Sequence, residues 1–157
     1  MIYRKKEKKE FFSPEEKKEF LSYAREVAEK GYYDNAAIIA AMVGAKDEAI
    51  KYIKKLADEK GDYYNAANTA IKIGALDWAR EYAKIIAEKG DYYNAAKITA
   101  MTGAKEETLE YIKKIPEIEH SKIGEILTIL KNYYESLRKK EEEEEGKERI
   151  RPLKWEL

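Results

Sequence analysis

The sequence predicts an all-α protein, a right-handed α-α superhelix (solenoid) of helical hairpins with about eight helices. The chain falls into register when Gly31, Gly61 and Gly90 are aligned, and the three copies read GYYDNAAIIAAMVGAKDEAIKYIKKLADEK, GDYYNAANTAIKIGALDWAREYAKIIAEK and GDYYNAAKITAMTGAKEETLEYIKKI. A second glycine follows 13 residues after each of these, so every copy divides into two short segments. Because one such pair of helices cannot bury its apolar faces alone, stacked copies are expected.

The N-terminal end is expected to hold a basic arm and a cap helix. Residues 1–12 form the arm, and the cap helix is predicted over residues 13–30. Ser13 suits the N-cap, Pro14 suits the first helical position, and Glu16 completes a capping box. Tyr23 in this helix aligns with Tyr82 of the repeat, so the helix is interpreted as half a repeat covering the stack.

The three repeats are placed at residues 31–60, 61–89 and 90–116. Asp62 and Asp91 lie just after a glycine, at the N-cap of the first helix of their copies. In the first copy Tyr32 replaces this aspartate, so that helix is expected to start without a side-chain cap. Gly74 ends the first helix of the second copy, and Lys-Gly pairs end the second helices.

Small side chains recur along the first helix of each copy. This alanine stripe allows two helix axes to approach closely. The second helices repeat larger residues at spacings of three and four, which predicts a core-facing stripe. The alanine positions are Ala36, Ala37 and Ala40, then Ala66, Ala67 and Ala70, then Ala95 and Ala96.

The repeat resembles the tetratricopeptide repeat over roughly residues 20–116. The resemblance is carried by an aromatic residue at Tyr63, small residues at Ala66 and Ala67, Gly74 seven residues later and Ala79 five further on. The period of 29–30 residues is shorter than the 34 of that family, and the usual proline at the end of the unit is missing. The resemblance implies a protein-binding scaffold with no catalysis of its own.

After Pro116 the repeat pattern stops, and a terminal helix is predicted over residues 121–146. Its apolar residues cover a broad face, which either closes the stack or pairs with another chain. Glu141–Glu145 place negative charge near the end of this helix, where the macrodipole is unfavourable and fraying is expected. Residues 147–157 are interpreted as a C-terminal tail that Pro152 biases toward extended structure and that carries the apolar anchor Trp155.

Composition argues against several broad classes. Lysine plus arginine and aspartate plus glutamate both number 31, so the net charge is zero. A generic nucleic-acid or membrane-surface protein would carry a basic excess. The chain has no cysteine and no long apolar run, which favours a cytoplasmic protein, and its many Glu and Lys residues are typical of heat-adapted proteins.

Catalytic motifs find no positive support in the sequence, so we expect a protein that is not an enzyme. His120 is the only histidine and cysteine is absent, so neither a paired-histidine metal motif nor a thiol nucleophile can form. The Gly-Ala-Lys turns at Gly44 and Gly103 lack the rest of a phosphate-binding loop. No cofactor and no metal site is predicted.

A protein partner is therefore the leading hypothesis, bound as a peptide or helix on the face formed by the first helices. One asparagine recurs in every copy and either supports its own helix start, forms a ladder between repeats or binds a peptide backbone. Positions that differ between copies are stronger candidates for contact, and exposed Met and Ile there would form an apolar patch. The predicted contact residues are Asn35, Asn65, Asn94, Ile38, Asn68, Lys97, Thr69, Met42, Lys72, Met101 and Trp155, with Ile39 beside them.

Self-association and RNA binding are two further interactions that the sequence raises. The terminal helix or tail is expected to mediate homo-oligomer formation. An RNA- or ribosome-associated factor is the alternative, using the basic arm and surface tyrosines such as Tyr64 and Tyr93. The neutral charge balance argues against it.

Overall fold

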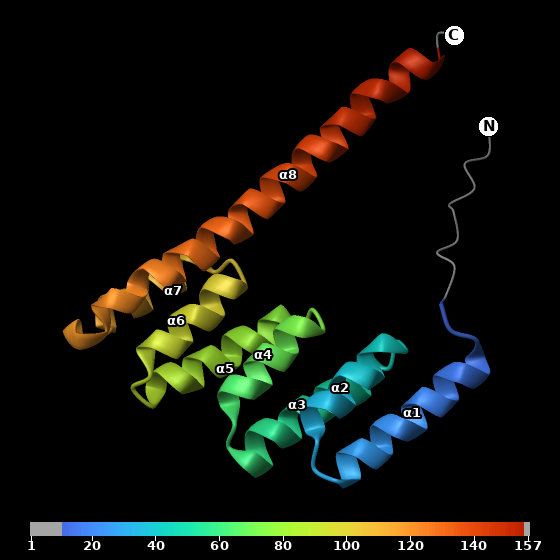
Figure 1. Cartoon of the computed structure of the whole chain (residues 1–157), viewed down its shortest axis with the longest axis horizontal. Coiled ribbons are helices and arrows are strands. Elements are labelled where there is room, and N and C mark those ends of the chain that lie inside the picture. The colour runs from blue at the N-terminus through green and yellow to red at the C-terminus, as the bar shows by residue number, and fades with distance from the viewer. Residues whose placement is uncertain (1–10, 156–157) are drawn as a thin grey trace. The chain divides into compact units, whose positions relative to one another are not determined.

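Most described residues lie in helices that are joined by short turns (Figure 1). In the computed structural model the backbone is described for residues 11–155 and the side chains for residues 11–146. This part of the chain contains eight α-helices and one 3-10 helix, and consecutive helices pack as hairpins. The prediction of an all-α chain of sequential hairpins is confirmed. The chain divides into two compact units, residues up to 73 and residues from 74 on.

The first unit is built around a short central helix. It contains α1 (Pro14–Glu29), α2 (Tyr33–Met42), α3 (Lys46–Lys60) and α4 (Tyr63–Lys72). Helix α2 contacts the other three, and its Ala36, Ala37 and Ala40 are fully buried. Because these side chains are small, three helices can surround one ten-residue helix at short interaxial distance.

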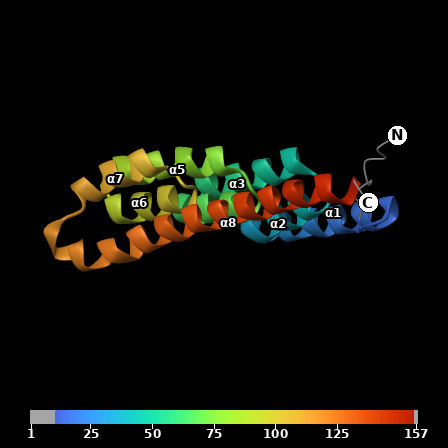
Figure 2. The same cartoon turned by 90° about the horizontal axis from the view of Figure 1, so that it is seen from above.

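The second unit repeats this plan around α6. It contains α5 (Leu76–Glu88), α6 (Tyr92–Met101), α7 (Lys105–Lys114), the 3-10 helix η1 (Glu117–Lys122) and α8 (Ile123–Trp155). Helix α6 contacts α5, α7 and α8, and Figure 2 shows α8 running alongside it. Ala95, Ala96 and Ala100 of α6 are fully buried. The alanine stripe predicted from the repeat therefore forms the centre of both units.

The helix starts follow the sequence signals. The Ser13 hydroxyl accepts a hydrogen bond from the Glu16 amide, and the Ser13 amide donates to the Glu16 carboxylate, both at 3.1 Å. The side chains of Asp62 and Asp91 accept from backbone amides three residues later. Tyr32 makes no side-chain cap, as the missing aspartate predicted.

Helix α8 closes the second unit with its N-terminal half. Ile126 and Leu130 are buried in a cluster with Ala96, Ala100 and Ile115. Of the two roles predicted for this apolar face, closure of the stack is the one seen. Helix α8 does not end near residue 146, since its backbone stays helical to Trp155. Neither the fraying expected at Glu141–Glu145 nor the extended backbone expected after Pro152 is present, because the helix continues through both.

Gly103 is where α8 meets the end of α6. Its φ of +74° lies in the left-handed region, and a Cβ atom there would overlap the ring of Tyr133. The adjacent Tyr134 hydroxyl donates to the Gly103 carbonyl at 3.0 Å. Gly103 is therefore required both by its backbone conformation and by the close approach of α8.

Replacing Gly103 with alanine should destabilise the protein by about 2–4 kcal/mol, since the strained φ and the overlap with Tyr133 both add cost. Gly74→Ala is the matched control, because Gly74 has a φ of +82° but open space at its Cβ position. That control should cost only about 1 kcal/mol. Urea unfolding followed by circular dichroism measures both, and equal costs would contradict the tight contact with Tyr133.

Candidate functional site

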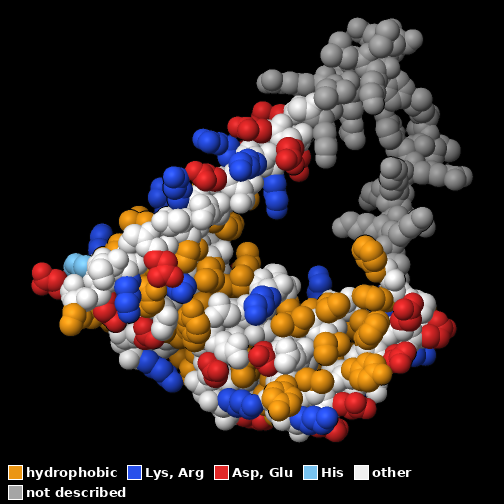
Figure 3. Space-filling model, in the orientation of Figure 1, with side chains coloured by type: hydrophobic (Ala, Val, Ile, Leu, Met, Phe, Trp, Pro, Cys, Tyr) orange, Lys and Arg blue, Asp and Glu red, His pale blue; other side chains and the backbone are white. Residues whose placement is uncertain are grey.

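An apolar groove lies between α1 and α2 in the first unit. Its volume is about 300 Å³, and every side chain that lines it is aliphatic or aromatic. Figure 3 shows hydrophobic side chains gathered on the surface over these two helices. The lining residues are Phe12, Phe20, Tyr23, Ile39, Met42 and Val43.

The hairpin geometry creates this groove. The two helices are antiparallel, so the N-terminal half of α1 faces the C-terminal end of α2. Toward the turn the contact is made by alanines, with Ala24 and Ala36 fully buried. Toward the open end the side chains are large, and the rings of Phe12 and Phe20 meet edge to face with centroids 5.0 Å apart. The groove is thus walled by aromatic and aliphatic groups at the end where the hairpin opens.

One side chain of this groove, Tyr23, is more exposed than the tyrosines at the equivalent position of the first two repeats. Tyr23 aligns with Tyr52 and Tyr82, each of which is 5% exposed, whereas Tyr23 is 48% exposed. In the first unit Tyr52 lies on α3, which has α1 beside it, whereas no described helix precedes α1. Met42 on the other wall is 62% exposed. The groove is the open end of the hairpin series, where a preceding helix would otherwise pack.

A charged network holds α1 beside α3. The Arg25 guanidinium donates to the Glu48 carboxylate at 3.0 Å, and the Tyr52 hydroxyl donates to the same oxygen at 2.7 Å. Burial acts to raise the pKa of Glu48, but the hydrogen bonds from Tyr52 and Arg25 outweigh it and hold the pKa below its usual value. Burial, followed by the bond to Glu48, raises the pKa of Tyr52 to about 12. The network fixes the helix that supplies one wall of the groove.

The predicted contact residues of the first unit lie partly in the groove, partly on α4 outside it and partly in the interior. Met42 lines the groove together with Ile39, and Ile38 is half-buried one position earlier. On α4, Asn68 is half-buried, Lys72 is exposed and Thr69 is buried, its hydroxyl donating to the Asn65 carbonyl at 2.8 Å. Thr69 is therefore not accessible for partner contact, which corrects its place among the predicted residues.

The recurrent asparagines lie at the helix starts. The backbone amide of Asn65 donates to the Asp62 carboxylate at 3.1 Å, and the backbone amide of Asn94 donates to the Asp91 carboxylate at 3.2 Å. The amide of Asn35 donates instead to the neighbouring Asp34 at 2.9 Å. The Asn94 side chain also donates from its Nδ2 atom to Asp91 at 2.7 Å, which supports the start of its own helix, and the roles considered for the side chains of Asn35 and Asn65 stay predictions.

In the second unit the predicted residues are engaged with α8 or lie outside the described side chains. The Lys97 ammonium pairs with Glu125 of α8 at 3.2 Å, and the Tyr93 hydroxyl donates to the same carboxylate at 2.7 Å. These hydrogen bonds, that of Tyr93 first, hold the pKa of Glu125 below its usual value. Met101 is half-buried, and the side chain of Trp155 lies outside the described residues.

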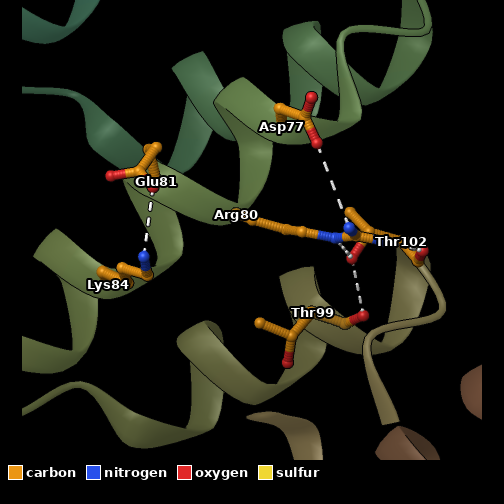
Figure 4. A network of polar contacts seen from close by, with 6 residues as sticks. All are labelled: Asp77, Arg80, Glu81, Lys84, Thr99 and Thr102. Atoms are coloured by element: carbon orange, nitrogen blue, oxygen red, sulfur yellow. Dashed lines mark hydrogen bonds and ion pairs between the residues drawn. The ribbon is translucent and has the colours of Figure 1, made fainter. Parts of the chain in front are cut away.

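A polar depression of about 210 Å³ lies between α5, α6 and α7. Figure 4 shows the polar contacts among residues of α5 and α6 at this place. Arg80 donates to the Thr102 hydroxyl at 3.2 Å and to its carbonyl at 3.0 Å, while Lys84 pairs with Glu81 at 3.1 Å. The Thr102 hydroxyl in turn donates to the Thr99 carbonyl at 2.8 Å. Arg80 thus caps the C-terminal end of α6. The polar side chains around the depression therefore have a structural role.

Within the described part of the chain, no three Asp, Glu or His side chains gather as they would around a metal ion. The same residues include no helix that combines the length and the apolar character needed to cross a bilayer. His120 lies in η1, with its Nε2 atom 3.1 Å from the Ile115 carbonyl oxygen.

Sequence reasoning missed the α1 wall of the groove. Phe20 and Tyr23 were assigned to a cap helix, whose outer face should be polar, and Phe12 was assigned to the basic arm that precedes it. The available signal was the alignment of Tyr23 with a core position of the repeat, because a core residue at the end of a series has no preceding helix to cover it.

Neutralising Glu48 should test the charged network. Because the folded pKa of Glu48 is lowered, its stabilising contribution is present above the unfolded pKa of about 4.3 and is lost as the pH falls through the folded value. Glu48→Gln should reduce the free energy of unfolding by up to about 1 kcal/mol at pH 7, a limit that allows for solvent screening of the half-exposed pair, and should have little effect near pH 2. The control Asp47→Asn removes an exposed charge from the same helical turn. An equal loss in both variants would contradict the network, as measured by urea unfolding.

The structure shows an all-helical protein whose helices pack as sequential hairpins, with an apolar groove at the α1–α2 end of the first unit. Comparison with family models, with curated proteins and with solved structures gives no match.

Proposed function

We propose that this protein is a non-catalytic interaction scaffold that binds an apolar helix or peptide of a partner protein in the α1–α2 groove. The observation that carries the proposal is the exposure of Tyr23, at a repeat position that is buried in the two following copies. A partner helix in the groove would take the place of a preceding repeat and bury Tyr23 and Met42, which are the most exposed of the lining residues.

The chemistry of the groove supports a helical apolar ligand. Its walls offer aromatic rings and a flexible methionine, which adapt to aliphatic side chains spaced three and four apart on a helix. Among the lining side chains only Tyr23 carries a polar group, its hydroxyl, so the lining offers far more apolar contact than hydrogen bonding. The proposal narrows the predicted first-helix face to the part contributed by Ile39 and Met42.

In this proposal the hairpins form a right-handed superhelix of the tetratricopeptide-like kind. Support comes from the repeated alanine stripe, the capping aspartates and the glycine turns, which recur at the repeat period. Such scaffolds bind partners through side chains that differ between copies, and the groove residues Ile39 and Met42 correspond to Thr69 and Lys72 in the second copy.

The alternative of an RNA-associated factor remains a prediction of the sequence. Tyr93, one of the tyrosines considered for base stacking, has the ammonium groups of Lys97 and Lys122 at 5.9 and 5.1 Å from its ring centroid. These cations and the bond to Glu125 already engage the ring and the hydroxyl, which favours a role in docking α8.

The groove should select helical peptides with apolar residues at three- and four-residue spacing. A displayed library of helical peptides would be selected against the full chain, and binders would be measured by fluorescence anisotropy. Met42→Glu should weaken their binding at least tenfold, since it places a charge among apolar groups.

The control for this experiment is Ile118→Glu, because Ile118 is 90% exposed in η1 and is not among the residues that line the groove. It should leave the affinity unchanged. Binders that tolerate Met42→Glu, or a library that yields none, would contradict the proposal. A poly-uridine oligonucleotide that binds the wild type and Met42→Glu equally would favour the RNA alternative.

A further inference from the structure

Helix α1, which supplies one wall of the groove, also carries the exposed carboxylates Glu16 and Glu19. Glu19 stands four residues before Tyr23, as Glu48 stands four residues before Tyr52, so each carboxylate shares a helical face with its tyrosine. In the inner pair the preceding helix supplies Arg25 to the carboxylate. Glu19 and the nearby Glu16 are exposed, and the ion pairs seen among the described residues do not include Glu19. By analogy with Arg25, the ligand of this groove should carry an arginine beside its apolar residues.

The chain contains a segment of that chemistry at its own end. Residues 147–157 read KERIRPLKWEL, with four basic and two acidic residues. Ile150 and Leu153 are three residues apart, with Arg149 and Arg151 beside them. The positive charge and the helically spaced apolar residues complement the exposed Glu16 and Glu19 of α1 and the apolar groove, although Lys17 and Lys18 lie between these two carboxylates in the sequence.

The backbone of α8 carries this segment away from the rest of the second unit. The residues of α8 that contact α6 lie in its N-terminal half, and residues 138–145 are exposed. From residue 138 to Trp155 the helix adds about 27 Å at its rise of about 1.5 Å per residue. Figure 1 shows α8 extending well beyond α6 and α7. The described backbone of this segment, to Trp155, therefore lies beyond the part of α8 that packs against α6.

We propose that the α1–α2 groove binds the basic C-terminal segment of a second copy of this chain, with an arginine of that segment paired to Glu19. This inference rests on the proposed function of the groove and names its occupant. The contact joins two different surfaces, so each molecule offers one groove and one segment, and the copies associate head to tail into rings or open chains. A segment of eleven residues buries a small area, so the association is weak and depends on concentration.

Sedimentation equilibrium of the full chain tests the proposal. The weight-average mass should rise above the monomer mass of 18.3 kDa as concentration increases. Met42→Glu, which blocks the groove, and Leu153→Glu, which blocks the segment, should each remain monomeric, while Ile118→Glu should behave as wild type. A mixture of the two blocked variants retains one intact groove and one intact segment. That mixture should therefore approach twice the monomer mass and not exceed it.

Charge exchange tests the pairing with Glu19. Glu19→Lys should lower the association constant at least tenfold, and combining it with Arg149→Glu and Arg151→Glu in the same chain should restore association. Circular dichroism confirms that each variant is folded, and Glu19 and Met42 are both exposed, so neither change disturbs the core.

Each other outcome overturns the proposal in a recognisable way. A wild type that stays monomeric shows that copies do not associate. If Leu153→Glu then strengthens peptide binding in the groove, the segment occupies the groove of its own chain. Association that survives both blocking variants places the interface elsewhere. In these cases the groove remains testable with selected peptides, so failure of this inference is distinct from failure of the proposed function.

Discussion

The fully buried alanines of α2 and α6 are the constraint on which the rest of the structure depends. Each of these helices has only ten residues and is surrounded by three others, so larger side chains on it would push its neighbours apart. Ala36, Ala37 and Ala40 in the first unit, and Ala95, Ala96 and Ala100 in the second, have no exposed surface. Alanine contributes little apolar area of its own. Its effect is to bring larger residues on the flanking helices, such as Ile53 and Ile126, into a closed core.

The first and last hairpins differ in how far their apolar side chains are covered. At the C-terminal end α8 covers α6 with Ile126 and Leu130, and Tyr134 bonds to the turn that ends α6. At the N-terminal end α1 packs on α2 but keeps an aromatic residue of the repeat core half in solvent. An end repeat with a polar outer face would only keep such a series soluble. The groove of six apolar side chains at this end is the surface for which we propose a partner helix.

Positions that vary between copies have taken on structural as well as surface roles. Ala40 and Ala70 of the first two copies correspond to Thr99 in the third, and Ala49 and Ala79 correspond to Thr108. The hydroxyls of these threonines lie 2.9 Å apart in the buried core, so a polar contact replaces an apolar one at the same place in the fold. Arg25 forms an ion pair with Glu48 of α3, and Arg80 caps the C-terminal end of α6. Variation between copies is therefore not by itself a sign of partner contact, as the buried Thr69 also shows.

The sequence by itself determined the all-helical fold and the alanine stripe, because both follow from the periodicity of the repeat. It also determined the helix starts at Ser13, Asp62 and Asp91 and the turns at glycine, because these follow from local backbone preferences. The continuation of α8 to Trp155 was not predicted, since Gly146 and Pro152 weaken a helix locally and the local signal favoured an end. The groove could be predicted only through Met42 and Ile39. Its other wall was decided by tertiary structure, because whether Tyr23 is core or surface depends on the presence of a preceding helix, and the spacing of residues along the chain is the same in both cases.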